Sequence, residues 1–478
     1  MKQYHDLITH ILQHGEQKTD RTGTGTLSVF GHQMRFNLND GLPLLAAKFT
    51  PFKHTVGELL WFLSGDVSVT RLRDNYGVTF WDEWQYDDGT IGDGYGKQFR
   101  HIDMFYPVIP KKYEQAPVTT PLDALLSKGG KRDLNKRSVH GVGYYGAYDK
   151  DDKHYTLLVD VWRDMIGRCY DETDSAFPGY GAVGVHVSEE WQCFANFQRD
   201  AKKIPNWALK LEYPNDYSID KDTLWASNRY SKDTVMWASR RVQNANRANT
   251  AYFTATDPDG KERAFTSIGE ALREHGLNVS AVHRCLSGRL KSHHGWTNFQ
   301  YIEVPEGRVL RYYEVDQLKR LLAGLRHEPD SRRHVMTLWN PVDVDRTVLP
   351  PCHGTVIQFY VSASKRLSCQ VYQRSVDTFL GLPVNLASYA TLTMMIAQSL
   401  GYGLGDLIWT GGDCHLYSNH QDQAREVQRR YAAGEVPATL PTLTIAGHAG
   451  KRIDDYALAD FTLTNYFHAG KLPAPVAV

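Results

Sequence analysis

Leu349-Pro350-Pro351-Cys352-His353 is the stretch of sequence that decides how the rest of the chain is interpreted, together with Tyr372-Gln373-Arg374-Ser375 downstream. A cysteine attacks only as its thiolate, and a nearby guanidinium favours that charged form. A lone cysteine is more often a small buried apolar residue. Arg374 in the second motif makes Cys352 a candidate nucleophile.

Further motifs lie on both sides of this pair. They are Asp20-Arg21-Thr-Gly-Thr-Gly-Thr, Gly57-Glu58-Leu-Leu-Trp-Phe-Leu, Trp81-Asp-Glu-Trp84, Tyr95-Gly-Lys-Gln, Pro329-Asp-Ser-Arg332-Arg333, Leu382-Pro-Val-Asn385, Gly411-Gly-Asp-Cys-His415-Leu-Tyr417 and Ala474-Pro-Val-Ala-Val478. In this order they resemble the thymidylate synthase family, folate-dependent enzymes that methylate dUMP. The resemblance covers residues 1–102 and 309–478. It implies an α/β (α+β) fold with a large mixed sheet, interrupted by residues 103–308.

Composition is consistent with a soluble protein of several domains. The chain has 478 residues, 42% of them hydrophobic, and 54 acidic side chains balance 54 basic ones. This length exceeds one ordinary domain, and the neutral balance argues against binding polyanions along the whole chain. No apolar run reaches the length of a membrane helix, and the first residues contain no apolar signal core. The six scattered cysteines fit a reduced, cytoplasmic protein.

Hydrophobic periodicity predicts the main elements of the outer segments. Apolar residues recur at helical spacing over residues 7–12, and residues 27–38 alternate like a half-buried strand. Residues 315–325 and 386–400 are predicted helices, and the second is apolar on all sides, as in a buried helix. Residues 356–361 and 367–372 are predicted to be neighbouring strands.

The chemistry of the uracil ring explains the need for a nucleophile. Its C5 becomes nucleophilic only after a thiolate adds at C6, which is covalent catalysis by Cys352. The resemblance implies that 5,10-methylenetetrahydrofolate then supplies both the carbon unit and the hydride, so that the synthase needs no metal. Glu58 would organise proton transfer around the ring, with Tyr95 and His353 in supporting hydrogen-bonding roles.

The nucleotide contacts are also carried over from the family. Arg21 and Arg374 would hold the phosphate, joined by Arg332 and Arg333 from a second subunit of a homodimer. Asn385 can donate and accept, which matches the O4 and N3–H edge of uracil. Ser375, His415 and Tyr417 would bind the nucleotide, the last two at the sugar hydroxyl.

The folate contacts come from three regions of the sequence. Trp81 and Trp84 would wall the folate cavity, and Asp377 would bind the pterin. The C-terminal segment that contains Ala477 would close as a flap and exclude water. One departure from the family is an extra residue between Cys352 and Gln358, which we expect a β-bulge to absorb.

The interruption, residues 103–308, is large enough to hold domains of its own. A Pro- and Lys-rich stretch, residues 107–137, is predicted to be a linker or extended arm. Segments between residues 138 and 247 then resemble phage HNH-type homing endonucleases. Asp220, Asp222 and Asn246 are candidates for holding a divalent cation. Lys221 and Thr234 stand where a general-base His and a central Asn are common, so this motif is more typical of a degraded or purely DNA-binding domain (residues 103–250).

Residues 251–308 resemble the small helix-turn-helix repeat attached to homing nucleases. A hairpin is predicted over residues 252–260, a helix over residues 265–277 that Gly276 ends, and a second short helix over residues 280–288. The second helix would enter the major groove of DNA. A modest basic bias fits phosphate contacts, whereas a surface helical hairpin with solvated charges is the simpler alternative.

Three alternatives compete with the interpretation as a synthase, and the first of them is ruled out. An intein is disfavoured because the interruption has no terminal His-Asn pair, so it should stay in the mature chain. A dUMP hydroxymethylase shares the early chemistry but lets water capture the methylene, and Trp81 with the closing flap favours hydride transfer instead. The third is a DNA-binding or DNA-cutting element carried in an inactive synthase shell.

Overall fold

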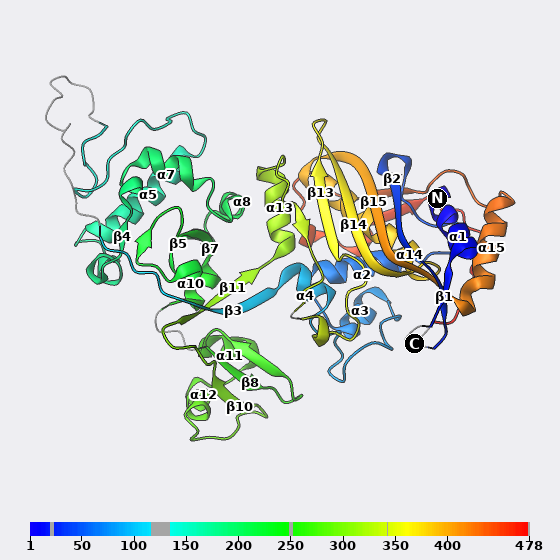
Figure 1. Ribbon diagram of the computed structural model, residues 1–478, viewed down its shortest axis with the longest axis horizontal. Helices are drawn as coiled ribbons and strands as arrows, with labels where there is room; N and C mark the ends of the chain where they lie inside the picture. Colours follow the sequence, from blue (N-terminus) through cyan, green and yellow to red (C-terminus); the bar gives the residue numbers. More distant parts are fainter. Residues whose placement is uncertain (20–22, 116–133, 248–251, 342, 477–478) are drawn as a thin grey trace. The chain divides into compact units, whose positions relative to one another are not determined.

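The computed structural model describes residues 1–19, 23–115, 134–247, 252–341 and 343–476 (Figure 1). The chain divides into two compact units. The first, which we call the sheet unit, consists of Met1–Ile102 and Val315–Val478. The second, the inserted unit, is Asp103–Glu314. Its end lies six residues beyond the expected residue 308, because the strand that leads back to the sheet unit belongs to the inserted unit.

A six-stranded mixed sheet organises the sheet unit, in the order β1-β2-β15-β14-β13-β12. The central β14 and β15 run parallel, whereas the other neighbours are antiparallel. The expected neighbouring strands are therefore confirmed as β13 and β14. The strands are β1 (Glu16–Lys18), β2 (Thr26–Asn37), β12 (Val335–Met336), β13 (Val356–Val361), β14 (Arg366–Asp377) and β15 (Gly403–Tyr417).

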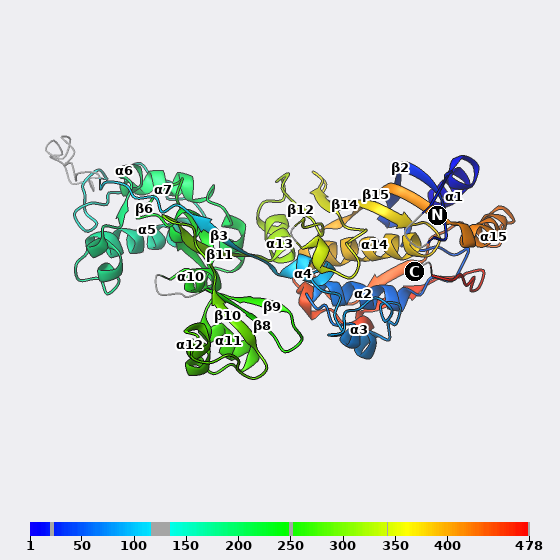
Figure 2. The same ribbon diagram turned by 60° about the horizontal axis from the view of Figure 1, so that its bottom comes forward.

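Helices cover one face of this sheet. The apolar α14 (Gly381–Leu400) contacts β14 and β15 on one side and α2 (Phe52–Leu63) on the other, and Figure 2 shows these layers in turn. Because α14 is covered on all sides, it needs no polar face. The remaining helices are α1 (Lys2–His14), α3 (Val69–Tyr76), α4 (Tyr95–Arg100), α13 (Gln317–His327) and α15 (Gln421–Ala432), and a hairpin of β16 (Thr442–Ile445) and β17 (Phe461–Thr464) completes the unit.

Most predicted elements of the sheet unit are confirmed, with three corrections. The helix expected over residues 386–400 begins five residues earlier, at Gly381. The helix expected from residue 315 begins at Gln317, because Val315 ends strand β11 and the Asp316 carboxylate caps the helix by accepting from the Lys319 N–H. The expected bulge beside Cys352 is wrong, since β13 and β14 pair without a shift from Val356 to Val361. The extra residue is taken up in the loop before β13, where Gly354 has φ +68°.

The inserted unit begins and ends with paired strands, β3 (Ile102–Val108) and β11 (Val309–Val315). The start of the expected linker is thus strand, and its residues 116–133 lie outside the described ranges. A first core gathers around buried tryptophans such as Trp162, Trp191 and Trp237. Its elements are α5 (Tyr155–Tyr170), β4 (His186–Val187), α6 (Glu189–Gln192), α7 (Phe194–Ala201), α8 (Trp207–Glu212), β5 (Tyr217–Asp220), α9 (Asp222–Trp225), β6 (Arg229–Tyr230), β7 (Met236–Ser239) and α10 (Arg240–Ala245).

A second, smaller core follows between residues 252 and 301. The predicted hairpin and both predicted helices are present, and Gly276 ends the first helix in the left-handed region. A strand that the sequence analysis missed, β10, pairs with β8 to give a three-stranded sheet under the helices. The elements are β8 (Phe253–Thr256), β9 (Glu262–Phe265), α11 (Ile268–His275), α12 (Val279–Leu286) and β10 (Thr297–Tyr301).

The base of the insertion is the place where the chain leaves and re-enters the sheet unit. There, within each unit, side-chain hydrogen bonds and an ion pair hold the outgoing and the returning segment together. In the sheet unit Arg100 Nε lies 3.0 Å from Asp316 Oδ2, and Gln317 Nε2 donates to the Gln98 carbonyl at 2.7 Å. In the inserted unit Tyr312 Oη donates to Asp103 Oδ1 at 2.9 Å. The chain therefore leaves and re-enters the sheet unit at one place.

Candidate active site

Cys352 lies in the loop before β13, against the side chain of Arg374 on β14. The Arg374 N–H donates to the Cys352 carbonyl at 3.0 Å, and its guanidinium donates to the carbonyls of Pro350 and Pro351 at 2.8 and 3.0 Å. These bonds fix the loop that carries the thiol.

The Tyr95 hydroxyl is the closest polar partner of the thiol. It lies 3.5 Å from Cys352 Sγ and accepts the Cys352 N–H at 3.0 Å. Burial raises the pKa of Cys352, and the Tyr95 hydroxyl and the Arg374 guanidinium act against that rise. The expectation that Arg374 lowers the thiol pKa is right as a contribution but wrong as the net direction, because desolvation is larger. The resting thiol is neutral, and addition must include loss of its proton.

Glu58 of α2 is buried next to this group. Its carboxylate accepts from Trp81 Nε1 at 2.6 Å, and burial raises its pKa to about 7 although this hydrogen bond acts in the opposite direction. A carboxyl with that pKa exchanges its proton readily near neutral pH. Glu58 therefore has the properties of an acid–base group.

His353 is placed for hydrogen bonding and not for proton transfer. Its Nδ1 lies 2.8 Å from the Tyr389 hydroxyl, and its ring packs 4.6 Å from that of Tyr95. Burial lowers the pKa of His353 to about 3, so the ring is neutral at physiological pH. It can orient Tyr95 and Tyr389 and carries no charge.

A chain of side-chain hydrogen bonds orients Asn385. Two of its members, Gln373 and Trp409, were not predicted as site residues from the sequence. Trp409 Nε1 donates to Gln373 Oε1 at 2.9 Å, and Gln373 Nε2 is 3.1 Å from Asn385 Oδ1. An indole N–H only donates, so it fixes which end of Gln373 points to Asn385. Because Gln373 donates to Asn385 Oδ1, the Nδ2 hydrogens of Asn385 point away from Gln373. Gln373 belongs to the same motif as Arg374, but neighbouring side chains of a strand point to opposite faces of the sheet, so Gln373 points toward α14. From the sequence alone, that face was expected to hold only core side chains.

Ser375, His415 and Tyr417 lie side by side on β14 and β15. Ser375 is paired in register with Asp413, and His415 with Asp377. The Asp413 carboxylate accepts from Ser28 Oγ at 2.6 Å and lies 3.5 Å from His415 Nδ1. The His415 ring and the Ser28 hydroxyl lower the pKa of Asp413 to about 2. The sequence analysis gave Asp413 no role.

Asp377 ends β14 and caps the turn that follows. Its Oδ1 accepts the N–H groups of Phe379 and Leu380 at 2.8 and 3.0 Å. Burial acts to raise its pKa, but the His420 ring and these N–H groups hold the pKa of Asp377 below its usual value. The Asp377 carboxylate is therefore ionised.

Trp84 is half-buried and meets Trp81 edge-on, with ring centres 6.4 Å apart.

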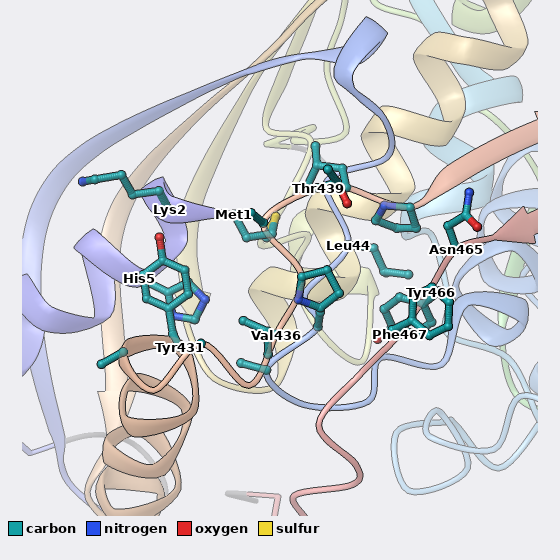
Figure 3. Close-up of a pocket in the computed structure, with 18 residues that line it drawn as sticks. Met1, Lys2, His5, Leu44, Tyr431, Val436, Thr439, Asn465, Tyr466 and Phe467 are labelled. Carbon is teal, nitrogen blue, oxygen red and sulfur yellow. The ribbon is translucent and has the colours of Figure 1, made fainter.

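The remaining predicted residues are not joined to this cluster by the described contacts. Arg332 and Arg333 are exposed between α13 and β12. Arg21 and Ala477 lie outside the described residues. A separate cavity of about 500 Å³ lies beside α1 and α15, near His5 and Tyr431 (Figure 3). Of the predicted site residues that the structure describes, none lines it.

The three nuclease candidates of the inserted unit are engaged in internal bonds. Asp220 Oδ1 accepts the N–H groups of Asp222 and Thr223, and Lys221 Nζ lies 2.8 Å from Asp222 Oδ1. Asn246 Nδ2 donates to the Tyr312 carbonyl and its Oδ1 accepts the Tyr312 N–H, each at 2.8 Å. Burial and Asp222 raise the pKa of Asp220. Lys221 thus places an ammonium beside the acidic pair.

Across the described ranges no three His, Cys, Asp or Glu side chains come together in a way that could hold a metal ion. Within the same ranges every helix is too short or too polar to cross a lipid bilayer.

One comparison with known families bears on this site. The family model described as thymidylate synthase matches residues 2–136 and 270–478, leaving a gap of about 130 residues. Both matched stretches run past the sheet unit into residues that belong to the inserted unit. The gap is compatible with an insertion. Because the match covers more than half of the chain and includes the cluster around Cys352, the chain belongs to the thymidylate synthase family.

Proposed function

We propose that the protein converts dUMP to dTMP, with 5,10-methylenetetrahydrofolate as carbon donor and reductant. The observation that carries the proposal is the buried cluster in which Tyr95 Oη lies 3.5 Å from Cys352 Sγ and Glu58 has a pKa of about 7. The thiol loses its proton and adds to C6 of uracil, which makes C5 a carbanion. Glu58 then holds and moves protons around the ring.

Uracil selection falls to Asn385 in this proposal. Because Gln373 donates to Asn385 Oδ1, the Asn385 amide N–H groups are directed to the O4 of the base. The second lone pair of Oδ1 accepts the N3–H. Arg374 with Arg21 binds the phosphate, Ser375 contributes a further nucleotide contact, and His415 and Tyr417 bind the sugar hydroxyl.

The folate side fits an aromatic heterocycle with N–H donors. Asp377 is an ionised acceptor at the end of β14, and the paired rings of Trp81 and Trp84 offer an aromatic surface. When bound, the folate supplies a one-carbon unit and a hydride. The residues of the chain hold it, and the C-terminal segment that includes Ala477 excludes water from the intermediate.

We also propose a homodimer in which Arg332 and Arg333 reach the phosphate of the partner site. The face of the sheet opposite α14 carries exposed apolar side chains, among them Val356, which is 41% exposed, and Tyr360, which is 63% exposed. Val335 on β12, next to both arginines, is 46% exposed. Exposed apolar side chains on one sheet face favour association through that face.

The test mixes the protein with dUMP and methylenetetrahydrofolate, follows dihydrofolate by absorbance and identifies the nucleotide by mass. We expect dihydrofolate and dTMP in equal amounts, and no turnover by Cys352→Ser. Hydroxymethyl-dUMP without dihydrofolate would establish the hydroxymethylase alternative. No product with either protein would contradict the proposal.

For the inserted unit we propose DNA binding without cleavage. The exposed side of α12 and the loop after it carry His283, Arg284, Arg289 and Lys291, while Val282 and Cys285 are buried on the other side. Such a surface suits phosphate contacts. We expect salt-dependent binding of duplex DNA, weakened by Arg284→Ala. We expect no nicking with Mg²⁺, because Lys221 already neutralises Asp222; nicking that Asp220→Ala abolishes would contradict this.

A further inference from the structure

His420 sits where the sheet unit meets the C-terminal segment. It ends a short 3-10 turn, Ser418–His420, directly after β15, and its side chain is 0% exposed. Its Nε2 lies 2.7 Å from the carbonyl oxygen of Pro475, and its Nδ1 lies 3.9 Å from Asp377 Oδ2. The ring is enclosed by Phe379 and Tyr417, with ring centres 5.5 and 5.6 Å away.

Both atoms that face the imidazole nitrogens are hydrogen-bond acceptors. A neutral imidazole carries one N–H and can satisfy only one of them, whereas an imidazolium donates from both nitrogens. The protonated ring therefore hydrogen-bonds the Pro475 carbonyl and forms an ion pair with Asp377, whose Oδ2 lies beyond hydrogen-bond distance of Nδ1. Protonation of His420 thus links Asp377, at the end of β14, to Pro475 of the C-terminal tail.

The charged and titratable groups around the ring come from four segments. Asp377 on β14 is the closest carboxylate, and Lys48 lies before α2, with its Nζ 4.3 Å from the centre of the Phe379 ring. Tyr4 of α1 donates to the Thr378 carbonyl and interacts with Asp377, and Tyr417 contributes the remaining titratable group. Burial and Lys48 act to lower the pKa of His420, but the bonds to Asp377 and Pro475 raise it above its ordinary value.

We propose that His420 is a positioning residue that latches the C-terminal tail closed by tying the Pro475 carbonyl to Asp377. The inference rests on the proposed function, in which Asp377 binds the pterin and the tail excludes water. The latch makes the two events interdependent, because an ionised Asp377 keeps His420 protonated and the protonated ring holds the tail. Folate binding and tail closure then share the His420–Asp377 ion pair.

The latch has a pH dependence of definite sign. A group whose pKa is higher in the closed state stabilises that state below its ordinary pKa, and the stabilisation is lost as pH rises through the raised value. For His420 the ordinary value is 6.5, so the tail loosens on the alkaline side of 6.5. Loss on the acid side requires protonation of Asp377, whose pKa is lowered.

The experiment compares three full-length variants with the wild type. His420→Phe keeps a ring of similar size without donors, and His420→Gln keeps a donor without the positive charge. His5→Gln is the matched control, because His5 is also buried in the sheet unit, at 3% exposed, and its ring stacks on Tyr431 and not on His420 or Pro475. Deuterium uptake of peptides covering residues 471–478 reports on the tail without turnover, and steady-state kinetics report on the site.

We expect faster uptake in the tail peptides of His420→Phe, partial rescue by His420→Gln and no change in His5→Gln. The KM for folate should rise about tenfold in His420→Phe while the KM for dUMP stays within twofold, and hydroxymethyl-dUMP should appear beside dTMP. After correction for intrinsic exchange, uptake in the wild type should rise above pH 6.5 and stay flat in His420→Phe.

Equal tail uptake in His420→Phe and His5→Gln would overturn the latch, whatever the kinetics. A wild type that makes no product while its tail uptake still depends on His420 would overturn the proposed function and leave the latch in place. A rise in both KM values together, with unchanged tail uptake, would show a merely structural role for His420 and also overturn it.

Discussion

At the scale of single residues, the burial of Glu58 predicts a stability cost that grows with pH. Its pKa rises from 4.5 to about 7 on folding, so ionising this carboxyl costs more free energy in the folded protein than in the unfolded chain. Between those values the unfolding free energy falls, by ~3 kcal/mol in total at about 1.4 kcal/mol per unit. Glu58→Gln keeps the acceptor for Trp81 without a titratable proton. We expect it to abolish turnover and to unfold at higher denaturant at pH 8.

Urea unfolding of both proteins at pH 5 and pH 8 measures this difference. The gain from Glu58→Gln should be about 3 kcal/mol at pH 8 and below about 1 kcal/mol at pH 5. A gain of the same size at both pH values would show that Glu58 does not titrate in this range.

A second residue-scale prediction concerns Trp409, which orients Gln373 and through it Asn385. Trp409→Phe removes the indole donor, so Gln373 is free to turn its amide and Asn385 loses its fixed orientation. We expect the preference for dUMP over dCMP, measured as the ratio of kcat/KM values, to fall on the order of tenfold, since one hydrogen bond contributes about 1 kcal/mol.

The matched control is Trp61→Phe. Trp61 is equally buried, at 1% exposed, but its Nε1 has no hydrogen-bond partner within the described ranges. It should lose stability without losing base preference. If both variants keep the wild-type ratio, orientation through Trp409 does not set the choice of base.

At the scale of elements, the loop between Cys352 and β13 depends on Gly354. Its φ is +68°, and a Cβ there would lie 2.4 Å from Tyr389 Oη. Gly354→Ala must therefore strain the loop and displace Tyr389 from His353, at a cost of about 1–3 kcal/mol. We expect a lower unfolding temperature and slower alkylation of Cys352. Gly77→Ala, also at positive φ but with open space around it, should lower the unfolding temperature alone.

Sequence periodicity was sufficient for elements whose pattern is local. Leu7, Ile8 and Ile11 predicted α1, and the alternation in residues 27–38 predicted β2, because one face of each is buried. β10 and β11 were missed because their partners, β8 and β3, come from distant or untypical sequence. Cys352, Tyr95 and Glu58 were named from three separate motifs through the family resemblance, and the structure places the Tyr95 hydroxyl 3.5 Å from the Cys352 thiol. The role of Gln373 depends on a neighbour on another strand, which no pattern in its own segment could indicate.

At the scale of the whole molecule, the closed base of the insertion predicts that the sheet unit folds without it. Replacing residues 103–314 by a short Gly-Ser turn leaves the Arg100–Asp316 ion pair and the Gln317 bond to Gln98 in place. A short connection between adjacent ends costs little entropy. We expect a folded protein whose kcat for dTMP formation is within about threefold of the wild type.

A control variant places the same turn but also carries Asp316→Ala, which removes the ion pair and the cap of α13. It should be less stable than the deletion alone, typically by ~1 kcal/mol or more. Circular dichroism, thermal unfolding and the dihydrofolate assay compare the two. An insoluble or inactive deletion would show that the sheet unit needs the inserted unit.

The adjacent ends of the insertion also bear on how such a chain can arise and be re-engineered. A segment that enters and leaves at one point can be gained or lost in a single recombination event, without compensating changes in the host. Selection can then act on host and passenger separately. Between Ile102 and Val315 the fold can accept an inserted domain whose two termini lie as far apart as two neighbouring strands.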